Sequence, residues 1–343
     1  MKHEAADRAY STHLGDKVLE AYRAVSQGFQ SFGLLDYPSH WNIGDSAIWL
    51  GEIELLERLH GRRPDYVSHV RYAHAEPGRF LPKGLIYLHG GGNFGDIWPH
   101  YQVYREAMLQ LYPDHRIVQL PQSIHFQKPE GIEKTKRAIG AHRDFHFMVR
   151  DHESLDFATR HFDCPVMLVP DSAFGIGMGK FPRAAAPSGI KCLFRSDKER
   201  REDAQAGVAL FSDATVEDWD RRSKQRQIAE KGVMGALMTM PPVPGKGALM
   251  ALRERAFTAM ARSRVALGFA QLDAAEVIVT DRLHGHIMAS LLGKPHVVID
   301  NFYGTIANFI KAWPADTITL QARDYAQAHD MAQQLLADQR AKT

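Results

Sequence analysis

Residues 277–292, VIVTDRLHGHIMASLL, decide the fold of this chain. The first four are β-branched and do not alternate with polar residues, as in a strand that is buried on both faces. Thr280 or Asp281 then caps a helix that the following apolar residues predict as far as Leu292. A buried strand that runs directly into a helix is typical of a parallel α/β sheet.

The same alternation continues on both sides of this stretch. Upstream, the apolar patterns predict a short strand from Leu34 and further strands at 84–88, 117–120, 145–149 and 166–169. A helix is predicted at 15–29, before the first of these strands, and further helices lie between the strands at 42–59 and 101–112. Beyond a Pro/Gly-rich run, the patterns predict strands at 191–194, 208–211 and 296–299 and helices at 215–237, 248–267 and 322–338.

This alternation predicts two Rossmann-like, doubly wound domains that face a cleft. The Pro/Gly-rich run at 181–189 is the expected linker. We therefore place an N-terminal domain at 1–182, a C-terminal domain at 190–320 and a final helix within 321–343. In doubly wound sheets, ligands bind beyond the carboxyl ends of the strands, so candidate residues are sought there.

Composition excludes several classes of protein. The chain has 343 residues, of which 45% are hydrophobic and 24% charged, which are ordinary globular values. The net charge of +2 comes without a basic stripe, so nucleic-acid binding is not expected. Neither the two cysteines nor the 18 histidines show metal-ligand spacing, so no metal is predicted. Without a signal peptide or a run of roughly 20 apolar residues, the expected location is the cytoplasm.

Arg282 and His284 predict an anion site. Both fall in the first turn of the helix that follows Thr280, where the helix dipole already places about half a positive charge. An arginine is favourable there if an anion binds against the exposed N–H groups. His284 could bridge a phosphate or transfer a proton. A surface arginine beside a packing histidine is the alternative, and His286 is expected to be a packing residue.

A glycine-rich segment follows the strand at 84–88. Residues 85–96 read LIYLHGGGNFGD, and Gly91 and Gly92 would let the backbone approach a ligand closely. The spacing does not fit a dinucleotide fingerprint. The HGGG loop of esterases also requires a GxSxG motif, which is missing. A plain tight turn therefore remains the alternative to a ligand loop.

Further candidates lie at other loop–helix junctions. Residues 42–46, NIGDS, open an amphipathic helix, where Asn42 and Asp45 are either caps or groups presented to a cleft. Three charged residues end buried-type strands, and each is either a site residue or a member of a structural ion pair: Arg150, Asp171 and Arg195.

Taken together, these motifs resemble the polysaccharide pyruvyltransferase family. The matching elements between Leu34 and Ile310 are NIGD, HGGGNFGD, VRDHES, PDSAF, FRSD and TDRLHGHI followed by GKP. The resemblance implies a GT-B-like fold whose C-terminal helix often crosses back to the first domain. It also implies phosphoenolpyruvate as donor without any cofactor, and transfer that builds a pyruvate ketal on a hexose of a lipid-linked oligosaccharide. Such an acceptor would bring the enzyme to the inner face of the membrane, which leaves peripheral membrane contact open.

The resemblance and the chemistry together assign candidate roles. Donor binding is expected from Thr280, Arg195, Arg282 and His284, and Arg282 and His284 are also catalytic candidates. The base for the sugar hydroxyl is sought among Asp45, Asp171 and Asp96. The remaining acceptor-side and loop candidates are Asn42, Gly44, Gly91, Gly92, Asn93 and Arg150. Many members have a lysine where this chain reads NFYGTIA at 301–307.

Two other functions fit the same features. A nucleotide-sugar glycosyltransferase on this scaffold would also need cations at a helix N-terminus, there for a diphosphate. A non-catalytic protein that binds anions could retain the fold. The sequence does not distinguish the acceptor sugar, the stereochemistry of the ketal or the oligomeric state.

Overall fold

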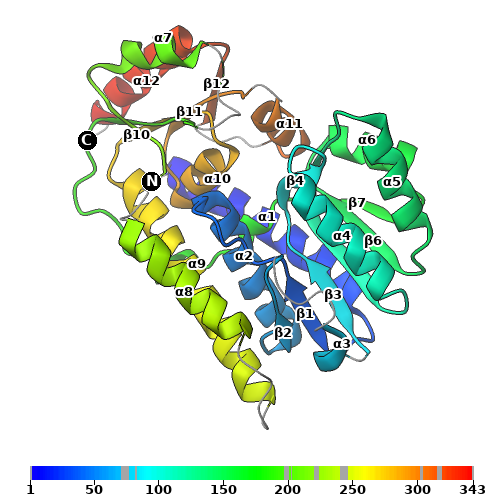
Figure 1. Ribbon diagram of the computed structural model, residues 1–343. Helices are drawn as coiled ribbons and strands as arrows, with labels where there is room; N and C mark the ends of the chain where they lie inside the picture. The colour runs from blue at the N-terminus through cyan, green and yellow to red at the C-terminus, as the bar shows by residue number, and fades with distance from the viewer. Residues whose placement is uncertain are drawn as a thin grey trace. The chain divides into compact units, whose positions relative to one another are not determined.

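The computed structural model is shown in Figure 1. It describes residues 2–70, 77–81, 83–196, 201, 203–219, 224–239, 246–301, 304–314 and 319–341. The chain forms two compact units: unit 1 comprises Met1–Leu14, Gly177–Arg221 and Ser263–Thr343, and unit 2 comprises Gly15–Ile176 and Arg222–Arg262. These units do not follow the predicted ranges 1–182 and 190–320, because each unit contains segments from both halves of the chain.

Unit 2 is built on a seven-stranded sheet whose strands are all paired in parallel. The order is β2-β1-β3-β5-β6-β7, and β4 pairs with β5 outside this path. The strands are β1 (Phe32–Leu35), β2 (Tyr66–Val67), β3 (Leu85–Leu88), β4 (Gly91–Gly95), β5 (Arg116–His125), β6 (Phe145–Val149) and β7 (Val166–Leu168).

Helices cover both faces of this sheet (Figure 1). Ile86 and Leu88 pack into one core with α4 (Pro99–Leu111), α5 (Pro129–Gly140) and α6 (His152–His161). Leu85 and Tyr87 pack into the opposite core with α1 (Lys2–Ser26), α2 (Ile43–His60), α8 (Lys224–Thr239) and α9 (Lys246–Asp273). The short elements α3 (Pro77–Phe80) and η1 (Ser172–Gly175) complete unit 2. Alternate residues of one strand thus enter two cores, which explains the absence of a polar face in the sequence.

Unit 1 contains a five-stranded parallel sheet in the order β12-β11-β10-β8-β9. Its strands are β8 (Ile190–Leu193), β9 (Thr215–Glu217), β10 (Val277–Thr280), β11 (His296–Ile299) and β12 (Thr319–Ala322). Its helices include η2 (Met178–Lys180), α7 (Ala204–Val208), η3 (Ala209–Phe211), α10 (Leu283–Leu292), α11 (Thr305–Ala312) and α12 (Tyr325–Arg340). Tyr325 and Ala328 of α12 are buried in the core of this sheet, so the described packing of the final helix is within unit 1.

The predicted α/β class with parallel sheets is confirmed, whereas some element predictions are wrong. Residues 208–211, predicted as a strand, end α7 and form η3. The predicted glycine loop is strand β4, which extends the pairing of β5. No helix in the described part of the chain is long and apolar enough to cross a membrane.

Candidate functional site

Two hydrogen bonds tie together the carboxyl ends of β8 and β10, and a third closes the turn after β10. The Thr280 hydroxyl donates to the Leu193 carbonyl at 2.9 Å and accepts the Arg282 backbone N–H at 3.1 Å. The Asp281 carboxylate accepts the Arg195 backbone N–H at 2.8 Å. The structure therefore brings together three of the predicted donor-binding residues. We call Arg195, Asp218, Thr280, Asp281, Arg282 and His284 the β10-edge group.

The first turn of α10 places the two histidines in different environments. Gly285 allows the turn to approach the strand, since a Cβ there would lie 2.3 Å from the Thr280 Oγ1. His284 is half-buried in this turn. His286 is buried, and its Nδ1 lies 2.8 Å from the Nε2 of His296. Burial and the neighbouring imidazole hold the pKa of His286 well below its usual range. His286 is accordingly a packing residue, as the sequence predicts.

Arg282 binds a carboxylate that the sequence analysis missed. Its Nε and Nη2 donate to the two oxygens of Asp218 at 2.7 and 2.8 Å. Asp218 follows β9 and also accepts from the Ser196 hydroxyl at 2.7 Å. Burial favours a higher pKa for Asp218, but the bonds and charge of Arg282 outweigh burial and lower it. An anion that binds Arg282 must therefore compete with an ionised internal carboxylate.

Asp281 carries a buried oxygen that has no hydrogen-bond partner among the described residues. Its side chain is 1% exposed, and only Oδ1 is engaged, by the Arg195 N–H. Desolvation by burial raises the pKa of Asp281 to about 6. The pKa of this carboxyl therefore lies closer to neutrality than that of an exposed aspartate.

A second group of polar residues lies in unit 2, beginning at the N-terminus of α2. Asn42 caps the helix, because its Oδ1 accepts the Gly44 N–H at 3.0 Å. Its Nδ2 donates to Asp45 Oδ2 at 3.0 Å, and His40 Nε2 lies 3.3 Å from the same oxygen. A Cβ at Gly91 would lie 3.8 Å from Asp45 Oδ1. Asn42 is thus a cap, and it also holds Asp45 beside the glycine-rich strand.

The glycine-rich strand β4 adopts backbone conformations that side chains disfavour. Gly91 and Gly95 have φ angles of 128° and 124°. A Cβ at Gly95 would meet a backbone carbonyl of β5 at 1.9 Å. Asp96 then accepts the N–H groups of Gln127 and Lys128, each at 2.8 Å. Its carboxylate therefore anchors the segment before α5, which gives Asp96 a structural task in this structure.

Arg150 and Asp171 form a buried ion pair, as the structural alternative predicted. Arg150 Nη1 donates to Asp171 Oδ2 at 2.7 Å, and its Nε donates to the Ser123 hydroxyl at 3.0 Å. Asp171 is fully buried, and its Oδ1 accepts the Ala173 N–H at 2.9 Å as the cap of η1. A Cβ at Gly92 would lie 3.0 Å from Arg150 Nη2. The pair therefore also borders the exposed glycine backbone.

Glu52 and His89 belong to the same region, and the sequence analysis did not select them. Glu52 Oε2 lies 2.7 Å from His89 Nδ1, and Oε1 accepts the Gly90 N–H at 2.8 Å. Burial alone would lower the pKa of His89, but the adjacent Glu52 carboxylate outweighs burial and raises it. The sequence did carry a signal for Glu52. It follows Asp45 by two helical turns and therefore lies on the same face of the predicted helix. We call Asn42, Asp45, Glu52, His89, Gly91–Asn93, Arg150 and Asp171 the β3-edge group.

The two groups differ in the chemistry that they offer. The β10-edge group supplies guanidinium groups and the N-terminus of a ten-residue helix, which suit an anion. The β3-edge group supplies carboxylate and amide groups that suit hydroxyls. No cluster of three or more His, Cys, Asp or Glu residues in the described ranges could hold a metal ion.

Residues 301–307 are the segment in which many family members have a lysine and this chain has none. Next to it, Asp300 accepts the N–H groups of Ile306 and Ala307 at the start of α11. Phe302 and Tyr303 lie outside the described residues.

These features define a Rossmann-like α/β protein with polar groups at the carboxyl ends of its strands. Comparison with known proteins makes the assignment specific. The sequence model of the family described as polysaccharide pyruvyl transferase matches residues 42–301. The chain belongs to the polysaccharide pyruvyl transferase family. It is therefore an enzyme of pyruvyl transfer in polysaccharide biosynthesis, with a polysaccharide acceptor.

Relatives support this assignment over most of the chain. The chain is 34% identical over 292 residues to putative pyruvyl transferase EpsO of Bacillus subtilis, covering 81% of this chain and 84% of EpsO. It is 28% identical over 305 residues to pyruvyl transferase 1 of Schizosaccharomyces pombe, covering 85% and 72%. An uncharacterized protein from Klebsiella pneumoniae has a similar fold, with a TM-score of 0.53 at 18% identity over 90% of this chain and 96% of that one.

Proposed function

We propose that the enzyme transfers the enolpyruvyl unit of phosphoenolpyruvate to two hydroxyls of a hexose, forms a cyclic pyruvate ketal and releases phosphate. The observation that carries this proposal is the β10-edge group. Hydrogen bonds at the ends of β8 and β10 hold Arg195 and Arg282 at one edge, with His284 in the first turn of α10. A donor with a phosphate and a carboxylate needs such a set of cations.

The chemistry requires a proton donor and a base. Protonation of the donor's methylene carbon makes C2 electrophilic, one sugar hydroxyl adds to C2, and a second hydroxyl then displaces phosphate. His284 serves as the acid or as a partner of the phosphate. Among the candidate bases, Asp45 is the best placed, because its side chain is 20% exposed whereas Asp171 is fully buried and bonded to Arg150.

The pair of Arg282 and Asp218 is part of this proposal. When the donor enters, its phosphate or carboxylate replaces the Asp218 carboxylate on the guanidinium fork. Donors of high negative charge are favoured in this exchange, because they must outweigh an existing ion pair. The proposal also includes a GT-B-like fold class, a lipid-linked acceptor and peripheral contact with the inner face of the membrane.

The test uses the purified protein with phosphoenolpyruvate and a panel of aryl hexosides. Released phosphate and the mass of the acceptor are followed together. The expected product is heavier than the acceptor by one pyruvate less one water, and phosphate is released in equal amount. If phosphoenolpyruvate neither releases phosphate nor raises the melting temperature while a nucleotide sugar does raise it, the donor assignment is wrong.

A further inference from the structure

Asp36 ends strand β1 in a backbone conformation that is rare for an aspartate. Its φ angle is 73°, and no other non-glycine residue in the described ranges has a positive φ. A side chain with a Cβ is disfavoured in this region, and Asn and Asp are the residues that tolerate it best. Strain of this kind persists where the surrounding structure enforces it, which is frequent at functional sites.

The Asp36 carboxylate is buried without hydrogen bonds. Its side chain is 2% exposed, and neither oxygen has a hydrogen-bond partner among the described residues. The nearest cation is Arg105 Nη2, at 3.8 Å from Oδ2. Desolvation raises the pKa of Asp36 to about 7 even though the Arg105 charge opposes this. The titratable groups that face it are Arg105 and Tyr104 from α4, His89 after β3, and Glu52 and Asp45 from α2.

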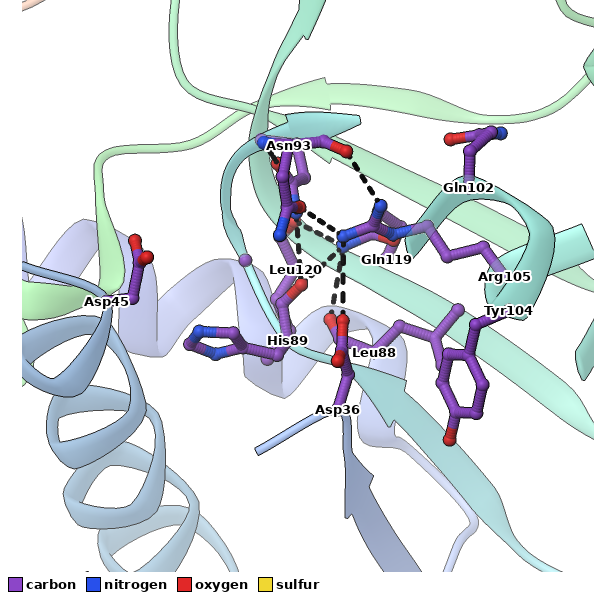
Figure 2. Close-up of polar contacts among 12 residues, drawn as sticks. Asp36, Asp45, Leu88, His89, Asn93, Gln102, Tyr104, Arg105, Gln119 and Leu120 are labelled. Carbon is purple, nitrogen blue, oxygen red and sulfur yellow. Dashed lines mark hydrogen bonds and ion pairs between the residues drawn. The ribbon is translucent and has the colours of Figure 1, made fainter. Parts of the chain in front are cut away.

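Arg105 connects this carboxylate to the glycine-rich strand (Figure 2). It is buried, and its Nε donates to Gln119 Oε1 at 2.9 Å. Its Nη1 donates to the Asn93 carbonyl at 3.0 Å, and its Nη2 donates to Asn93 Oδ1 at 2.5 Å. The guanidinium group therefore binds Asn93 at two points, on the backbone and on the side chain.

The orientation of the Asn93 amide is fixed by this arrangement. Gln122 Nε2 also donates to Asn93 Oδ1, at 3.2 Å, so two donors meet at the same oxygen. The other edge of the amide is then Nδ2, which donates to no described residue. Asn93 is half-buried and follows Gly92, which is exposed. The amide thus offers two N–H donors next to an exposed glycine, and these suit an oxygen of a ligand.

We propose that Asp36 and Arg105 are positioning residues for the sugar acceptor. Arg105 holds Asn93 so that its Nδ2 donates to a hydroxyl oxygen of the hexose, and Asp36 balances the buried guanidinium charge. This inference rests on the proposed function and deepens its acceptor side. Asn93 is the group that touches the acceptor, whereas Asp36 and Arg105 act through it.

A pH dependence follows from this arrangement. Protonation of Asp36 leaves the buried Arg105 charge without its counter-charge, which weakens the hold on Asn93. The KM for the acceptor is therefore expected to rise as pH falls through about 7, while the KM for phosphoenolpyruvate stays nearly constant.

The first variant to test is Asp36→Asn, which keeps the shape, tolerates the left-handed backbone and cannot ionise. At alkaline pH, the variant's KM for the acceptor is expected to be about tenfold higher than that of the native enzyme, as for loss of one well-placed hydrogen bond. The KM of the variant should also no longer depend on pH. Arg105→Lys and Asn93→Ala are expected to raise the same KM to a similar extent. The matched control is Asp114→Asn, a surface aspartate paired with Arg143, which should leave both KM values unchanged.

A second measurement does not depend on the donor. The side-chain amide resonance of Asn93, followed by ¹⁵N NMR, should titrate with a midpoint near pH 7 in the native enzyme and not in Asp36→Asn. If the Asn93 resonance titrates in Asp36→Asn as it does in the native enzyme, the proposed coupling between Asp36 and Asn93 is disproved. If the coupling is present but the variant's acceptor KM is normal, the positioning role is disproved. Failure of the native enzyme to release phosphate from phosphoenolpyruvate instead contradicts the proposed donor, and binding of the hexoside alone then replaces KM as the test of Asp36 and Arg105.

Discussion

The ion pair between Arg282 and Asp218 provides a direct test of donor binding at the scale of single residues. Arg282→Ala is expected to reduce turnover by roughly 100-fold, as for loss of a group that stabilises charge in the reaction, and His284→Ala to have a similar effect. Asp218→Asn should instead lower the KM for phosphoenolpyruvate, because the competing carboxylate is removed. Steady-state kinetics of the three variants give the answer, with melting temperatures to verify folding. Equal losses of turnover in Arg282→Ala and Asp218→Asn would show that the pair is only structural.

Asp281 should make stability depend on pH in a defined direction. Its pKa is raised in the folded state, so folding takes up a proton, and the stabilising effect of protonation is lost as pH rises from about 4 to 6. Asp281→Asn can still accept the Arg195 N–H and avoids the buried charge. The variant should therefore gain stability over the native enzyme as pH rises through this window, by at most about 3 kcal/mol. Urea unfolding at both ends of the window measures this, and a gain that shrinks with pH would contradict it.

The sequence selects single candidate residues only where the signal is local. Arg282 and His284 are candidates because a cation in the predicted first turn of a helix is unusual. Asp218 is not, because its partner lies 64 positions away and nothing near it in the chain indicates a site. Asp36 was missed for a related reason, since only the backbone angle and the absence of donors distinguish it from any aspartate in a loop.

At the scale of elements, two helical glycines should respond in opposite ways to the same substitution. A Cβ at Gly51 in α2 would lie 1.9 Å from the Ser172 carbonyl oxygen of η1, so Gly51→Ala must separate the two elements. We expect a loss of about 3 kcal/mol in unfolding free energy. Gly232 in α8 has nothing within 4 Å of that position, and Gly232→Ala should add about 0.5–1 kcal/mol through helix propensity. Denaturant midpoints measure both, and a stable Gly51→Ala would show that α2 and η1 are not held this closely.

The elements predicted best are the ones buried on both faces. Strands β3, β6 and β10 read as short apolar runs between turn signals, and the structure places them within one residue of the predicted positions. Residues 208–211 have the same apolar composition yet form the end of α7 and η3, because a short apolar run does not distinguish a strand from a buried helical turn. The two-residue strand β2 and strand β12 carried no pattern long enough to detect.

At the scale of the whole molecule, residues 1–182 should not fold well alone. Phe257 from the segment Arg222–Arg262 stacks on Tyr37 of unit 2 with ring centroids 4.3 Å apart. Without that segment, one core of the first sheet loses its cover. A fragment of residues 1–182 is expected to bind a hydrophobic dye and to unfold at lower denaturant than residues 15–176 joined by a glycine linker to 222–262. Equal stability of the two chains would show that the segment contributes little.

The sequence could not have indicated that the segment Arg222–Arg262 belongs to unit 2 rather than to unit 1. The helices at 224–239 and 246–273 follow the predicted linker and therefore read as part of the second domain. Their destination depends on distant contacts, such as the two hydrogen bonds from Arg63 to Glu254 at 2.9 and 2.8 Å. Only the number and type of the sheets followed from local patterns, whereas the assignment of these helices required the tertiary structure.

The interleaved segments of the two units also set an order for folding during synthesis. Unit 2 has all its residues once Arg262 has left the ribosome, whereas unit 1 must wait for Ser263–Thr343. The start of α1 is synthesised first, yet the carbonyls that bind Ser11 and Tyr10, those of Ser290 and Trp313, are among the later ones. A nascent chain from which unit 2 has emerged but β10 has not therefore carries a complete unit 2 and, of the sheet of unit 1, only β8 and β9. Chaperones and proteases would recognise this species by its open sheet edge.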